Sequence, residues 1–462
     1  IKNNNGTIQA IKNINITTTN DLNLDGNYTA NDTLNIKAKS LENNVDLKND
    51  GKITFNLSGN LTNNKNISST GNLNINAQKV LNTKNDSAIG SMANLSITAS
   101  SLENKGNILF GEGKGNKLKT TGNINNTGVI SSLSKLKIEA KDVLNDKQII
   151  SDNDLTLDVN SITNKGLLYS TNNMKVDFKD IFLNDKAEIY SSGDITINSE
   201  NGTFTNKVGE IESERNIKIV AKDIKNLAEV TGNHEIKGKV PAEKSNVDMS
   251  KLDIDKYNKL SADIVNSFFK EYIIKKVAKD KRIYIKLVKI SANENGGSFR
   301  KQGHGKDSEG YYGAWDWEKD KSKAGVYLTE ADEIKSNYTS KKSTLKAGGN
   351  ITLIAKNNVE NLESNILANG DVNITANQLI NKNFDIAIKR NITLKRDIEY
   401  HGDAMHNLEW GKTYNHMGQK IYNYNEDKGN VIIETEIDAV AGTGDNAKIS
   451  AGGNINITAN KV

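Results

Sequence analysis

The chain has 462 residues, a net charge of +4, one Pro, no Cys and 69 Asn, and only 35% of its residues are apolar. The absence of Cys excludes disulfide scaffolds, Cys-ligated zinc sites and thiol catalysis. A charge this small gives no reason to expect nucleic-acid binding, and no apolar run is long enough for a transmembrane helix. Because the chain begins with Ile and has no signal-peptide pattern, we expect it to be a segment of a longer protein.

A unit of about 20 residues recurs along most of the chain. Each copy has two aliphatic residues and then a small residue at alternate positions, a third aliphatic residue three positions later, and Asn two positions after that. The copies begin at Leu34, Leu73, Leu95, Leu136, Leu155, Ile217 and Val372, with shortened copies at Ile351 and Ile455.

This alternation predicts short strands that are buried on one face. A unit of this length without helical periodicity cannot bury its own apolar edge, so successive units must stack. We therefore predict an all-β fold, a parallel β-helix whose coils of about 20 residues pair in register. The Ala of each unit suits a cramped inward corner. The Asn residues suit left-handed turns and can form a hydrogen-bonded ladder along the axis.

The repeat is interrupted twice, which divides the chain into five parts. Residues 241–344 begin at the single Pro, have helical spacing over 256–279 and alternate as a strand over 282–290, so they predict a small α+β insert. This insert is basic: 241–345 holds 21 Lys and Arg against 16 Asp and Glu, and only six Asn. Residues 384–446 predict a projecting β-hairpin or lobe. The expected β-helix blocks are 1–240, 345–383 and 447–462.

These repeats resemble filamentous haemagglutinin repeats, particularly the sequence from Ile449 to Ala459, which reads ISAGGNINITA. Such repeats occur in large exoproteins of two-partner secretion, among them adhesins, haemolysins and contact-dependent growth-inhibition effectors. The resemblance covers well over half of the chain. It implies a right-handed β-helical filament that is secreted to the outer surface of a Gram-negative cell with the help of an outer-membrane secretion partner.

No constellation in the sequence supports catalysis. There is no Cys nucleophile, no G-x-S-x-G elbow and no HExxH-type metal motif, so we expect neither an enzyme nor a cofactor or metal site. The candidate partner-binding residues are aromatic side chains in polar surroundings within the two interruptions. They are Tyr311, Tyr312, Trp315, Trp317, Trp410 and Tyr414, and they could equally pack within the insert or on the β-helix.

The favoured function is that of a rigid extracellular stalk whose inserts bind a receptor, a protein or a glycan, on a host cell or a neighbouring bacterium. One alternative is the receptor-binding segment of a contact-dependent growth-inhibition filament that delivers a toxin. A weaker alternative is a β-helical enzyme that acts on polysaccharides, because function must be argued from a site and not from the fold.

Overall fold

The structure is a computed structural model. It describes residues 3, 5–254, 256–257, 283–289, 297–307, 310–319, 326–398, 413–416, 419–422 and 429–462. For 283–319, 396–398, 413–422 and 429–431 it describes the backbone alone, where it describes them at all. The chain forms two compact units. We call residues 1–232, 338–384 and 442–462 the solenoid unit, and residues 233–337 and 385–441 the inserted unit.

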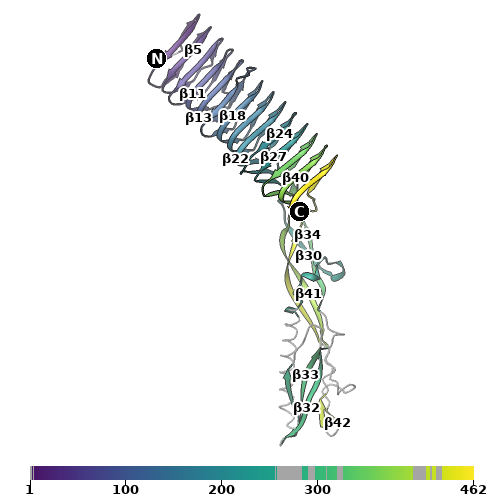
Figure 1. The fold of residues 1–462 in the computed structure, drawn as a ribbon. Coiled ribbons are helices and arrows are strands. Elements are labelled where there is room, and N and C mark those ends of the chain that lie inside the picture. The colour runs from purple at the N-terminus through teal and green to yellow at the C-terminus, as the bar shows by residue number, and fades with distance from the viewer. Residues whose placement is uncertain are drawn as a thin grey trace. The chain divides into compact units, whose positions relative to one another are not determined.

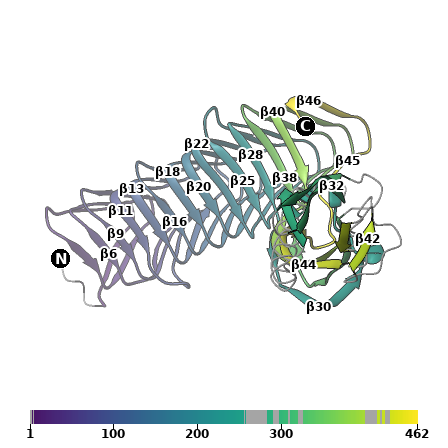
Figure 2. The same ribbon diagram turned by 90° about the horizontal axis from the view of Figure 1, so that it is seen from below.

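The solenoid unit is a parallel β-solenoid of about 15 turns whose coils are about 20 residues apart, as predicted (Figures 1 and 2). Each coil contributes a strand to each of three walls. The first wall consists of β2 (Asn13–Thr17), β5 (Thr33–Ala38), β8 (Lys52–Leu57), β15 (Lys117–Thr120), β24 (Ile195–Asn198), β27 (Ile217–Ala221), β37 (Ile351–Ala355), β46 (Ile455–Lys461) and the first halves of the long strands listed with the second wall.

The second wall carries the Leu-x-Asn part of the repeat. It consists of β3 (Leu22–Leu24), β6 (Leu41–Asn43), β9 (Leu61–Asn63), β16 (Ile124–Asn126), β25 (Thr203–Lys207), β28 (Asp223–Leu227), β38 (Asn358–Leu362) and the second halves of β11 (Leu73–Asn82), β13 (Leu95–Asn104), β18 (Leu136–Asn145), β20 (Leu155–Asn164), β22 (Met174–Asp185) and β40 (Val372–Lys382).

The third wall is a twelve-stranded parallel sheet of shorter strands. It consists of β7 (Leu47–Asn49), β10 (Asn66–Ser69), β12 (Ala88–Ser91), β14 (Asn107–Phe110), β17 (Val129–Ser132), β19 (Gln148–Ser151), β21 (Leu167–Ser170), β23 (Glu188–Ser191), β26 (Glu210–Ser213), β36 (Thr344–Ala347), β39 (Asn365–Ala368) and β45 (Lys448–Ala451). Near the start of the chain, β1 (Thr7–Ala10) pairs with β4 (Asn27–Ala30).

The repeat pattern sets the register between coils. In the pair β11–β13, Leu73 lies beside Leu95 and Asn82 beside Asn104, so equivalent positions of successive copies become neighbours. The aliphatic positions point inward and form one continuous core along the unit. The small residue also points inward, as expected, with Ala99 and Ala221 buried.

One part of the explanation for the Asn excess was wrong. The ladder exists, but left-handed backbone is not where the Asn residues lie. Among the described residues Asn5 is the one Asn with a positive φ. The other non-Gly residues with positive φ are Lys186, Val208 and Glu363, each two positions after an Asn of the ladder. The Asn therefore supplies hydrogen bonds, and in these three coils the residue two positions later adopts the left-handed backbone.

The inserted unit is built from both interruptions of the repeat and from residues 233–240, which were expected to belong to the β-helix. Its main sheet has four antiparallel strands in the order β30 (His234–Pro241), β34 (Val326–Ser336), β41 (Ile386–Ile398) and β44 (Gly429–Ala441). The strands β41 and β44 pair along their whole length, which is the expected hairpin. The strand β34 comes from the first interruption and pairs with β41 from the second. The two segments that the sequence presents separately thus share one sheet.

The described part of this unit also contains two short 3-10 helices, η1 (Ala242–Lys244) and η2 (Met249–Lys251), and two smaller sheets. In the first, β33 (Gly310–Lys319) lies between β31 (Ile283–Lys289) and β32 (Gly297–Asp307), and in the second β42 (Thr413–His416) pairs with β43 (Gln419–Tyr422). The helix expected over 256–279 lies outside the described residues apart from 256–257. The strand expected over 282–290 agrees with β31.

Candidate functional site

An asparagine ladder runs through the second wall. Each Nδ2 donates to the Oδ1 of the Asn on the next coil, over distances of 2.7–3.0 Å. Most members also donate to backbone carbonyls, either in the turn that follows, as Asn63 does to Lys65, or on the next coil, as Asn126 does to Gln148. Such satisfied buried amides stabilise one register, because a shift would leave them unpaired. The ladder comprises Asn43, Asn63, Asn82, Asn104, Asn126, Asn145, Asn164, Asn184, Asn206, Asn226, Asn361 and Asn381.

The ladder continues across the first interruption without a break. Asn226 Nδ2 donates to Asn361 Oδ1 at 2.8 Å although these residues are 135 positions apart, whereas the other steps span 19–22 positions. All three walls also continue in register there, through the pairs β26–β36, β27–β37 and β28–β38. The interruption therefore leaves the solenoid as if its two sides were consecutive coils.

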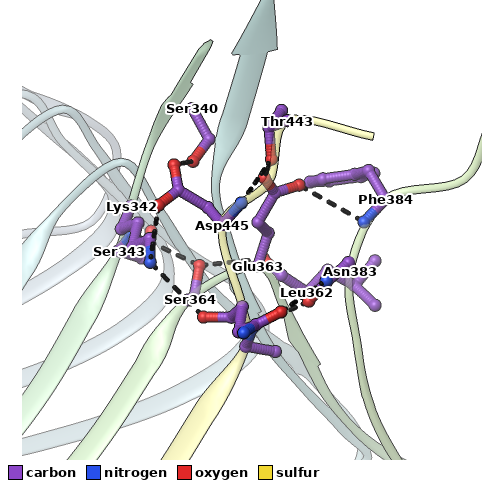
Figure 3. Close-up of polar contacts among 12 residues, drawn as sticks. Ser340, Lys342, Ser343, Leu362, Glu363, Ser364, Asn383, Phe384, Thr443 and Asp445 are labelled. Carbon is purple, nitrogen blue, oxygen red and sulfur yellow. Dashed lines mark hydrogen bonds and ion pairs between the residues drawn. The ribbon is translucent and has the colours of Figure 1, made fainter. Parts of the chain in front are cut away.

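A polar cluster lies within the solenoid unit where the chain returns from the first interruption and where it leaves for and returns from the second. We call it the junction cluster, and it consists of Ser340, Lys342, Glu363, Phe384, Thr443 and Asp445 (Figure 3). Its centre is Glu363, which is completely buried and has a φ of +49°. One carboxylate oxygen accepts the hydroxyl of Thr443, and the other accepts the backbone N–H of Phe384 at 3.3 Å. Glu363 therefore ties together the two ends of the second interruption.

Asp445 joins the end of the second interruption to the residues that follow the first. Its carboxylate accepts the Ser340 hydroxyl at 2.9 Å and lies 3.4 Å from Lys342 Nζ. These two hydrogen-bonding partners hold the pKa of Asp445 below its ordinary value. Nearby, Asn383 bonds both the side chain of Asn446 and the backbone N–H of Ala447. The cluster thus holds the end of the first interruption and both ends of the second at one place on the solenoid.

The inserted unit has a core of its own. Leu328, Ala331, Ile392, Leu394, Ile433 and Tyr257 are buried together in it. The guanidinium of Arg390, which is 8% exposed, donates from Nε to the carbonyl of Asp332 at 2.9 Å and from Nη1 to Asn246. The Asp332 carboxylate accepts two bonds from Asn391. A unit that folds separately requires its own hydrophobic core and hydrogen-bonded buried polar groups, and the inserted unit has both.

The structure assigns the predicted partner-binding residues to the inserted unit as far as it describes them. Tyr311, Tyr312, Trp315 and Trp317 belong to β33, the central strand of its three-stranded sheet, and Tyr414 belongs to β42. Trp410 lies outside the described residues.

Within the described ranges, no group of three or more His, Asp or Glu is arranged to hold a metal ion. The same part of the chain holds no helix with the length and apolarity that crossing a membrane demands. Comparison with protein-family models, with curated proteins and with solved structures finds no match for this chain.

Sequence reasoning missed the junction cluster. Glu363, Thr443 and Asp445 belong to no repeated motif, and the bonds among them join residues about 80 positions apart, such as Thr443 and Glu363. One signal was present: Glu363 stands two positions after Asn361, where no other coil of the ladder has an acidic residue. An acidic residue at this position indicates a local partner, but not which one.

Proposed function

We propose that this chain is a segment of a secreted, non-enzymatic surface filament in which the solenoid unit is a stalk and the inserted unit carries recognition. The observation that carries the proposal is the unbroken ladder at Asn226–Asn361. The coils of the stalk stack as though the insertion were absent. The stalk therefore does not need the inserted residues for its own folding. Such residues, on a separately folded unit, are where a binding function is expected.

The repeated motif supports the cellular setting of this proposal. Its resemblance to filamentous haemagglutinin repeats suggests secretion through an outer-membrane partner and a place outside a Gram-negative cell. A solenoid of about 15 turns suits that setting, because each coil adds about 4.8 Å of rigid reach without a large core. The partner would be a protein or glycan receptor on a host cell or on another bacterium.

A delivery filament for a growth-inhibition toxin is the second candidate, because an insertion after a long first block of repeats could serve as its receptor-binding region. The two candidates predict different surroundings for this segment. A toxin domain further along the parent protein, with a small immunity gene beside it, would favour delivery, and its absence would favour adhesion.

The test removes the inserted unit and keeps the stalk. Thr231 and Thr339 are register partners of β29 (Glu229–Thr231) and β35 (Thr339–Lys341), so an Asn-Gly linker from Thr231 to Thr339 closes a β-hairpin. Ile386 and Ala441 are likewise partners, so a short Gly-Ser linker can join Phe384 to Gly442. We expect this variant to keep its β circular dichroism and its cooperative unfolding while losing binding to target cells.

Retained cell binding by the deletion variant would contradict the assignment of recognition to the inserted unit. The matched variant is the full chain with Trp315→Ala and Trp317→Ala. Weaker binding at unchanged thermal stability supports an aromatic contact surface, whereas a fall in stability supports packing. Hydrolysis or lysis of any member of a polysaccharide panel by the full chain would contradict the non-enzymatic assignment.

A further inference from the structure

Both interruptions open at the same corner of the coil. The first lies between β28 and β36 and the second between β40 and β45, so each connects the second wall to the third. In the other described coils this corner is a short turn, such as Thr127 and Gly128 between β16 and β17. The third wall nevertheless continues in register after short and long connections alike. The length of the connection therefore does not fix the position of the strand that follows it.

The ladder amides reach the strand that follows this corner on the next coil. Ten of them donate from Nδ2 to the carbonyl of the first residue of a third-wall strand, over 2.9–3.3 Å. Asn104 bonds Val129 in this way, and Asn126 bonds Gln148. The acceptor is thus the same position of the coil in every case.

The same bond is present where the chain returns from each interruption. Thr344 is the first residue of β36, and its carbonyl accepts from Asn206 at 3.2 Å, across 138 positions of sequence. Lys448 is the first residue of β45, and its carbonyl accepts from Asn361 at 3.3 Å, across 87 positions. The ladder residue of the coil before an interruption therefore holds the returning strand as it would hold the strand after a short turn.

Pairing of the third-wall strands does not by itself select this register. The strand β36 has four residues, of which Leu345 and Ala347 point inward. A shift by two residues, about 6.6 Å, keeps both residues on the inward face, because side chains alternate with a period of two. A two-residue turn cannot span that added distance, whereas a long connection can.

The ladder amide distinguishes the two registers. Asn206 is completely buried, so its amide has no access to water. A shift of β36 by two residues would take the Thr344 carbonyl away from Asn206 Nδ2 and remove this hydrogen bond. Losing the partner of a buried donor is costly, and the native register avoids that loss. The hydroxyl of Ser343 adds a bond to the Asn206 carbonyl at 3.0 Å.

We infer that each of these ladder residues acts as a re-entry clamp, by which we mean that its amide fixes the register of the third-wall strand on the next coil whatever connects the two walls. The corner between the second and third walls is thereby the site at which this solenoid accepts inserted segments. Asn206 and Asn361 are the positioning residues for the two natural insertions. The inference goes beyond recognition, because it does not depend on what the inserted unit binds.

The central test places an insertion where the chain has none. A Gly-Ser segment of about 40 residues is put between Asp146 and Lys147, in the exposed turn that follows Asn145. The variant Asn126→Leu removes the clamp on Gln148. The solenoid accepts Leu at this position of the coil, since the buried Leu24 lies beside Asn43 in register. The segment and the substitution are made separately and together in the full chain.

Disulfide formation reports the register, because the chain has no Cys of its own. Ser131 and Ile150 are register partners on β17 and β19, so Ser131→Cys with Ile150→Cys forms a bridge in the native register. Ser131→Cys with Gln148→Cys lies about 8 Å apart between Cα atoms and forms a bridge only after a shift by two residues. Mild oxidation followed by mass spectrometry measures the yield of each bridge.

We expect the shifted bridge only when both changes are combined. The segment alone and Asn126→Leu alone should keep the native bridge, and the combination should raise the yield of the shifted bridge by about tenfold. No shifted bridge in the combined chain would overturn the inference. So would a shifted bridge, or a loss of β circular dichroism, with the segment alone, because the clamp would then be insufficient.

The natural re-entry gives a second test with a matched control. In Asn206→Leu we expect Glu212→Cys with Thr344→Cys to form a shifted bridge, although Glu212 natively pairs with Lys346. The control is Asn104→Leu with Leu109→Cys and Val129→Cys, which are related in the same way on β14 and β17. The two-residue turn before β17 should prevent the shift there. Equal yields in the two chains, or no shifted bridge in Asn206→Leu, would contradict the role of Asn206.

Discussion

The solenoid unit and the inserted unit solve the problem of stability in different ways. In the solenoid unit each coil pairs in parallel with the next, and one ladder of Asn and one column of aliphatic residues are repeated along it. In the inserted unit antiparallel strands from two distant segments enclose a small core and a buried Arg390. The solenoid unit is stabilised by the same residue types repeated in every coil, whereas the inserted unit is stabilised by a specific set of residues that occurs once. The Asn content of the sequence falls where the solenoid unit gives way to the inserted unit.

The difference can be followed with two probes. The three Trp residues, at positions 315, 317 and 410, all fall within the residue ranges that bound the inserted unit, so we expect their fluorescence to report on that unit. Circular dichroism mostly reports on the solenoid unit, which has most of the strands. Each substitution below should move one signal and leave the other in place, and a variant that moves both equally would refute the independence of the units.

Removing a buried aromatic ring should have the largest effect. Phe182 is fully buried in the solenoid core and stacks with Phe204, with ring centroids 5.2 Å apart. We expect Phe182→Ala to lower the free energy of unfolding by about 4 kcal/mol through the cavity it leaves. Ile181→Ala, at the adjacent exposed position, should cost well under that. Urea unfolding followed by circular dichroism measures both, and equal losses would show that the core assignment is wrong.

The buried guanidinium should matter next, and only for the inserted unit. Arg390→Ala leaves the Asp332 carbonyl and Asn246 without their donors, so we expect a loss of about 3 kcal/mol in the tryptophan-detected transition. The control Lys389→Ala removes a surface ion pair with Asp438 and should change little. A shift of the circular dichroism transition by Arg390→Ala would argue against separate folding.

The ladder can be tested with two neighbouring residues that face opposite ways. Asn126 is buried and bonds both Asn145 and the Gln148 carbonyl, while Asn125 is exposed. We expect Asn126→Ala to cost about 2 kcal/mol and Asn125→Ala less than about 0.5 kcal/mol in circular dichroism-detected unfolding. Similar costs would mean that the ladder contributes nothing beyond strand propensity.

The smallest effect concerns a surface carboxylate on the first wall. Hydrogen bonds from Lys137 and Lys119 lower the pKa of Glu139 to about 2 from its ordinary value of 4.5. The stabilisation is therefore complete above about pH 4.5 and is lost as the pH falls toward 2. Solvent screening leaves about 1 kcal/mol at neutral pH. Unfolding of Glu139→Gln and wild type between pH 7 and pH 2 should converge at the acidic end, and a constant difference would contradict this.

Part of this architecture was predictable because its contacts are periodic. Residues Leu73 and Leu95 are 22 positions apart and pair because the pattern itself returns after that distance. The inward and outward faces of the first wall follow from simple alternation. The inward and outward residues of the third wall were harder to predict, because most of its strands have only four residues. Its outward positions also include Ile150 and Tyr169, which the sequence alone cannot distinguish from core residues.

The sequence by itself determined the solenoid: its period, its inward residues and the Asn ladder, since each of these depends on the coil immediately before and after. Only the tertiary structure decided that both interruptions form one sheet through β34 and β41, that Asn226 meets Asn361, and that Glu363 binds Phe384 and Thr443. Asn226 and Asn361 occupy the same position of the repeat, but 135 positions separate them, so only the folded chain shows that their coils are neighbours. The contacts of β34 with β41 and of Glu363 with Phe384 and Thr443 join residues that no repeat relates, and no local pattern encodes them.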